Sequence, residues 1–81
     1  MPVHCVLVGD VGLKAVNRRS KSAHEAVVLV TAERSVVLRR RGAPSYGDPV
    51  LLEFVGQRVR AEGTLSAGQL ICDVIEPQAR D

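Results

Sequence analysis

Residues 57–66 alternate between polar and apolar side chains, and this pattern limits the possible folds more than any other feature of the chain. The apolar members are Val59, Ala61, Gly63 and Leu65. This is the period of a strand that buries one face. Ser66-Ala67-Gly68 then predicts a turn, and a returning strand is predicted over residues 69–76, with Pro77 ending it. The segment therefore predicts a β-hairpin.

The rest of the chain also favours strands. Only 2% of its 81 residues are aromatic and valine dominates the apolar set, which suits pleated strands because β-branched side chains are restricted at χ1. Gly9 and Gly12 predict a bend in a long first strand. Asp48-Pro49 predicts the start of a short helix. The predicted strands cover residues 3–16, 24–31, 35–40, 57–66 and 69–76, and the predicted helix covers residues 49–55.

The predicted order along the chain is three strands, one helix and two more strands, and the first strand is long and bent at glycine. This order resembles the layout of an OB-fold. The sharpest part of the resemblance is the run VRAEGTLSAGQLICDVIE, which is similar to the closing hairpin of many OB domains. The resemblance implies a mostly β fold, a five-stranded Greek-key barrel with one short helix between its third and fourth strands. Residues 1–81 then form one domain, similar to uncharacterised bacterial OB-like proteins.

A second resemblance covers the run from Tyr46 to Glu76, which is loosely similar to the barrel of bacterial haem chaperones of cytochrome c maturation. That family carries its haem histidine just after the last strand, where this chain has Pro77-Gln78-Ala79. That family is also anchored in a membrane. We therefore do not expect haem binding.

The chain shows no motif for catalysis or for a bound metal. His4, His24, Cys5 and Cys72 lack the local ligand pairs of a zinc site, and the glycines after Val8 are not followed by a phosphate-binding Gly-Lys-Ser. We expect a protein that is not an enzyme and needs no metal or cofactor, with both cysteines as buried free thiols. No segment approaches the roughly 20 apolar residues that span a bilayer, so we expect a cytoplasmic location without membrane contact.

Charge is distributed unevenly along the chain. Residues 14–41 hold eight basic residues and two acidic ones, whereas the remainder holds three basic and seven acidic. The basic residues form one cluster at the end of the first strand and after it, and a second cluster at the end of the third strand. If hairpins join the first three strands, these two clusters meet at one end of the sheet. This predicts a surface for the phosphates of single-stranded nucleic acid, formed by Lys14, Arg18, Arg19, Lys21, Arg39, Arg40 and Arg41 with Tyr46 as the one ring for base stacking. The alternative is that charged loops simply solvate a small domain.

The run Val27-Val28-Leu29-Val30 supports a different hypothesis. If Ala26, Val28 and Val30 point inward, then Val27 and Leu29 point outward and need cover. This predicts a protein-interaction or assembly module in which Val27 and Leu29 mediate self-association or bind a partner protein.

Overall fold

The computed structural model describes residues 2–16, 24–43 and 48–79, which form five strands and one short helix. The order agrees with the order predicted from the sequence, and the boundaries differ by one or two residues. The strands are β1 (Val3–Val16), β2 (His24–Val30), β3 (Ser35–Arg40), β4 (Arg58–Ser66) and β5 (Gln69–Pro77), and the helix is α1 (Pro49–Glu53).

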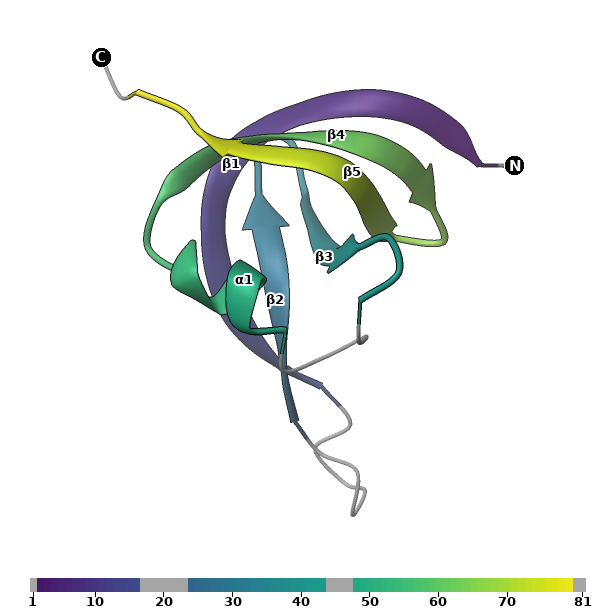
Figure 1. Cartoon of the computed structure of the whole chain (residues 1–81). Helices are drawn as coiled ribbons and strands as arrows, with labels where there is room; N and C mark the ends of the chain where they lie inside the picture. Colours follow the sequence, from purple (N-terminus) through teal and green to yellow (C-terminus); the bar gives the residue numbers. More distant parts are fainter. Residues whose placement is uncertain (1, 17–23, 44–47, 80–81) are drawn as a thin grey trace.

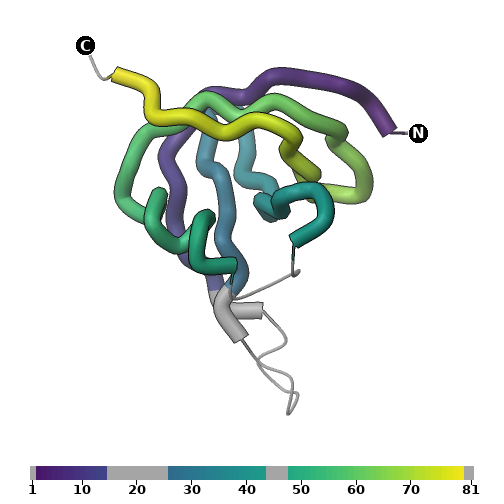
Figure 2. The backbone as a smooth tube through the Cα atoms, viewed as in Figure 1, coloured from purple at the N-terminus to yellow at the C-terminus, as the bar shows by residue number. Residues whose placement is uncertain are grey.

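The five strands form a closed ring in the order β1-β2-β3-β5-β4, drawn in Figure 1. β1 belongs to two parts of this ring, because residues Val3 to Asp10 pair with β4 and residues Asp10 to Val16 pair with β2. The ring closes through a parallel pairing of β3 with β5. The smooth trace in Figure 2 shows β1 curving strongly between its two partners.

Glycine makes two close backbone approaches possible. A Cβ atom on Gly9, at the bend of β1, would lie 2.2 Å from the carbonyl oxygen of Val30, and one on Gly63 would lie 2.0 Å from the carbonyl oxygen of Ile71. Gly63 also sits at a register shift between β4 and β5. The predicted bend is thus confirmed at Gly9, whereas a Cβ on Gly12 would lie no closer than 4.0 Å to Val28.

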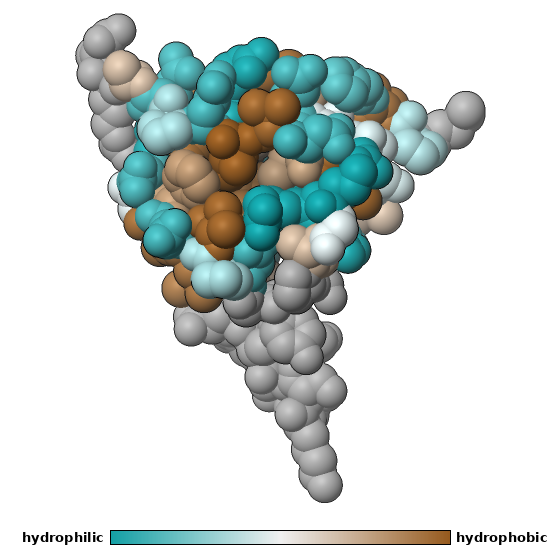
Figure 3. Space-filling view, viewed as in Figure 1, coloured by the Kyte–Doolittle hydropathy of each residue, from teal (hydrophilic) through white to brown (hydrophobic). Residues whose placement is uncertain are grey.

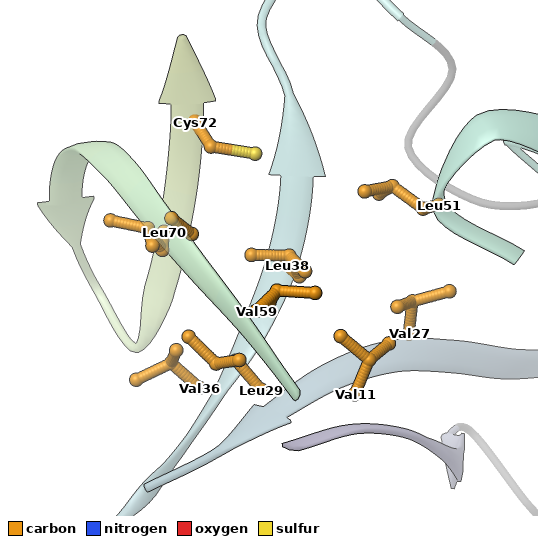
Figure 4. Packing of buried hydrophobic residues seen from close by; sticks show 10 residues of the cluster. Val11, Val27, Leu29, Val36, Leu38, Leu51, Val59, Leu70 and Cys72 are labelled. Atoms are coloured by element: carbon orange, nitrogen blue, oxygen red, sulfur yellow. The ribbon is translucent and has the colours of Figure 1, made fainter. Parts of the chain in front are cut away.

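The core fills the inside of the ring, as Figure 4 shows. Side chains from every strand meet there, and Leu51 of α1 is only 2% exposed, so the helix covers one end of the ring with a single apolar anchor. The buried cluster consists of Val11, Val27, Leu29, Val36, Leu38, Leu51, Val59, Ala61, Leu70 and Cys72.

The predicted facing of β2 was wrong. Val27 and Leu29 point into the core and are 6% and 0% exposed, while Val30 is 47% exposed. The error has a physical cause: Ala26 and Val28 on the opposite face are buried as well, so the apolar run carries no alternation to mark its inner side. Val27 and Leu29 therefore offer no surface to a partner, and self-association through them is excluded.

Within the described ranges, no helix is long and apolar enough to cross a membrane.

Candidate nucleic-acid interface

Lys14 and the arginine triplet lie at the same end of the β1-β2-β3 sheet. Lys14 pairs with Ala26 near the start of β2, and β3 runs antiparallel to β2, so the end of β3 returns to that start. The remaining predicted site residues, Arg18, Arg19, Lys21 and Tyr46, lie outside the described residues.

Lys14 and Arg39 also share the outer face of this sheet. Val36 and Leu38 point into the core, so Arg39 lies on the opposite side of β3. The pairing of β2 with β3 ends at Val28 and Val37, and Arg39 lies two residues further along β3, in the direction of the end where Lys14 pairs with Ala26. Both cations are therefore on the outer face and toward one end of the sheet.

Arg40 points the other way and is occupied within the protein. Its Nε lies 2.7 Å from Asp48 Oδ2 and its Nη2 lies 3.1 Å from Oδ1, the two-pronged geometry that suits guanidinium and carboxylate. Asp48 is only 1% exposed. Arg40 could contact a phosphate only by giving up this partner, so its role is structural.

Asp48 receives a second contact that fixes the start of α1. Its Oδ1 accepts a hydrogen bond of 3.0 Å from the backbone N–H of Val50, which confirms the predicted helix cap. The Arg40 guanidinium holds the pKa of Asp48 below its usual range, against the opposing effect of burial. Sequence reasoning identified the cap and missed its cation. The available signal was that Arg40 continues the inward row of Val36 and Leu38, where a charge needs a partner.

Arg41 has a carboxylate partner at the surface. Its Nε donates to Asp73 Oδ1, and its Nη2 donates to Thr64 Oγ1 at 3.2 Å. The side chains of Arg41 and Asp73 are 55% and 45% exposed, so water screens their attraction and the pair contributes little to stability. Arg41 can therefore exchange this carboxylate for another anion at low cost.

Arg39 is the member of the triplet without a carboxylate contact among the described residues. Its Nη1 lies 3.5 Å from Gln69 Oε1, a weak contact, and its Nε is buried with no acceptor in the described part of the chain. The Arg39 backbone is fixed from β5, where the Cys72 thiol donates to the Arg39 carbonyl oxygen at 3.0 Å.

The cysteines are free thiols. Cys72 is buried, which confirms that prediction, and burial raises the pKa of its thiol, so the thiol stays protonated and poorly reactive at neutral pH. Cys5 is half-buried against the core.

Among the described residues, no three His, Cys, Asp or Glu side chains gather as a metal ion would require.

The outer face of the β1-β4-β5 sheet carries charges that alternate in sign, unlike the end of the β1-β2-β3 sheet that holds Lys14 and the arginine triplet. His4 lies 3.3 Å from Glu62, and Arg60 lies between Glu62 and Glu76 at 3.5 and 3.4 Å. This face has no excess of positive charge for a polyanion.

Apolar side chains also reach the surface, and on the side seen in Figure 3 they gather between α1 and β5. Leu52 of α1 and Val74 of β5 are 43% and 44% exposed. A hollow of about 310 Å³ lies at another place, between the start of β3 and the β4–β5 turn, with Val3, Val36 and Leu65 as its apolar lining.

Comparison with protein-family models gave no match, and comparisons with curated proteins and with solved structures likewise gave none.

Proposed function

We propose that this chain is a non-enzymatic, OB-like binding module that contacts the phosphates of single-stranded nucleic acid through the outer face of its β1-β2-β3 sheet. The observation that supports the proposal best is the placement of Lys14 and Arg39 on one face and at one end of that sheet. Arg41 follows the same strand end and is exposed, with its side chain directed at Asp73 of β5 and Thr64 of β4, so it adds a cation with a replaceable partner at the border of that face. Arg18, Arg19 and Lys21 belong to the proposal by sequence alone.

The architecture favours this ligand class. A ring of five strands with a helix between the third and fourth is the layout of OB barrels, which commonly bind oligonucleotides on the face of their second and third strands. The strand order alone does not identify a ligand, because such folds carry many functions. The charge on that face is the additional argument.

We expect binding to be weak and tolerant of sequence. Bases bind such domains by stacking on aromatic rings, yet Phe54 packs against the core and Tyr46 is the one further ring of the chain. Phosphate contacts without stacking position a strand and do not read its sequence.

A salt titration with a short single-stranded oligonucleotide tests the proposal. Each neutralised phosphate adds about 0.7 to the slope of log affinity against log salt, so engagement of Lys14, Arg39 and Arg41 predicts a slope of about −2. The double variant Lys14→Gln, Arg39→Gln should weaken binding at least about tenfold at low salt and flatten that slope. Chemical-shift changes should map to residues 14–21 and 39–46.

The matched control is Arg58→Gln, Arg60→Gln, which removes the same charge from β4. The two double variants are therefore also compared at physiological salt, where net charge acts over distance far more weakly than a direct contact. Under that condition the control should stay within about twofold of the wild-type affinity. Equal loss in both double variants, or no shifted resonance in those two segments at saturating oligonucleotide, contradicts the proposal.

A further inference from the structure

The first half of β1 has a strand partner along one edge only. Residues Val3 to Asp10 pair with β4, but pairing with β2 begins at Asp10. Along the described residues, the edge of Val3 to Gly9 that faces away from β4 therefore has no strand beside it. Figure 1 shows this half of β1 arching over the top of the molecule, with β4 and then β5 below it.

The groups that point to this open edge follow from the alternation of the backbone. On the β4 side, the backbone N–H of Val11 donates to the carbonyl oxygen of Gln57, and the carbonyl oxygen of Val11 accepts from the backbone N–H of Gly56, each at 2.9 Å. Successive residues of a strand direct their N–H and C=O groups to opposite edges, and the β1–β4 register runs without a shift from Val3 to Asp10. The N–H and C=O groups of His4, Val6 and Val8 therefore point to the open edge.

Beyond Pro2 at its start, the sequence does not protect this edge. Proteins usually guard exposed strand edges with lysine, proline, inward charges or bulges, yet the run Val-His-Cys-Val-Leu-Val from Val3 to Val8 contains no lysine, proline or acid. Val3 and Val6 are also 57% and 43% exposed.

A second open edge in the same sheet is protected, and the contrast is informative. β5 pairs with β3 only from Gln69 to Cys72. In its remaining part, Asp73 has no partner residue in the β4–β5 register, where the register shifts. Glu76 then adds a charge, and the strand ends at Pro77, which lacks an N–H group. The open half of β5 carries charged residues along its length and proline at its end, whereas the open half of β1 is limited only by Pro2, directly before the strand.

We infer that this open edge of β1 is an interface between two copies of the chain, which pair antiparallel across it. The edge matches itself when Val6 lies opposite Val6 of the second copy and His4 lies opposite Val8. This register forms about six hydrogen bonds and joins the two β5-β4-β1 sheets into one.

A second copy suits the edge better than a charged partner does. The run contains no lysine, arginine, aspartate or glutamate, so it offers little to select an acidic or basic peptide, and the self-paired register sets His4 opposite Val8 and so brings no like charges together. A contact along one half-strand covers less surface than a typical stable interface. We therefore expect a dimer that dissociates on dilution.

Sedimentation equilibrium over a wide concentration range tests this inference with two matched variants. Val6→Lys places a charge at the centre of the pairing and should leave the protein monomeric at every concentration. Val74→Lys is the control, because Val74 is 44% exposed in the same sheet but lies on β5. It should dimerise like the wild type. Equal melting temperatures would show that both variants fold.

Amide hydrogen exchange supplies an independent measurement on the wild type. The N–H groups of His4, Val6 and Val8 should exchange more slowly as the protein concentration rises, while those of Cys5 and Leu7, already directed at β4, should not change. A wild type that stays monomeric at millimolar concentration, or a Val74→Lys variant as monomeric as Val6→Lys, overturns the inference. Neither result bears on nucleic-acid binding at the β1-β2-β3 face.

Discussion

Asp48 shows how one side chain can tie a helix to a strand. The carboxylate accepts from Arg40 at the end of β3 and from Val50 at the start of α1, and it is almost wholly removed from water. A charge in that position is tolerated only while both contacts persist. The residue thus divides the arginine triplet into an internal member and two outer ones.

Replacing Asp48 by Asn should lower the free energy of unfolding at neutral pH, because the amide keeps the cap but loses the attraction to Arg40. The pKa of Asp48 is depressed in the folded state, so the stabilisation is present above the unfolded value of about 4 and is lost as the pH falls through the folded value. Urea unfolding at pH 7 and pH 3 should show a gap between wild type and variant that narrows in acid.

Asp73→Asn is the control for this measurement. Arg41 likewise lowers the pKa of Asp73, but both members of that pair are exposed, so its effect should be clearly smaller. An equal loss in the free energy of unfolding for the two substitutions would show that burial does not make the Asp48–Arg40 pair more stabilising than the exposed pair.

At the scale of the elements, the β4–β5 hairpin depends on glycine at its irregular point. Gly63→Ala should destabilise the protein by at least about 2 kcal/mol, since the new methyl group would meet the backbone of Ile71 and Cys72. Gly12→Ala is the matched control in β1, where the space is open, and it should be neutral or stabilising by about 0.5 kcal/mol. Denaturant unfolding compares the two, and similar losses would contradict the packing at Gly63.

The turn of the same hairpin holds an unfavourable residue. Ala67 has φ of +52° and Gly68 has φ of +78°, the sign pattern of a tight hairpin turn that favours Asn-Gly. Ala67→Asn should therefore raise the free energy of unfolding by about 0.5–1 kcal/mol. Ala32→Asn, in the exposed turn after β2, has no positive φ to relieve and should change stability little.

At the scale of the whole molecule, the sequence predicted the elements better than it predicted their contacts. Alternation in β4 and the turn residues after it located the hairpin, because each signal is local. The facing of β2 failed because both of its faces are buried. The partner of Arg40 could not be identified either, since the Asp48 side chain reaches it only once the ring has closed.

The proposed nucleic-acid site stays a prediction, and the structure bears only on how its described residues are arranged. Hairpin reasoning expected Lys14 and the arginine triplet at one end of the sheet, and the antiparallel pairing of β1 with β2 and of β2 with β3 agrees with that expectation. Which of these guanidinium groups already has an acceptor depends on side-chain directions across three different strands. No pattern along the chain encodes that.

The position of β4 between β1 and β5 also determines how the protein should resist force. β1 and β5 both run antiparallel to β4, with Val3 opposite Leu65 and Pro77 opposite Val59, so Val3 and Pro77 lie at opposite ends of the same three strands (Figure 1). Tension between Val3 and Pro77 slides the strands along one another and loads many perpendicular hydrogen bonds together. Tension between Val3 and Leu65 opens those bonds one after another. In a single-molecule pulling experiment, we expect unfolding to need a larger force when the protein is pulled between Val3 and Pro77 than when it is pulled between Val3 and Leu65.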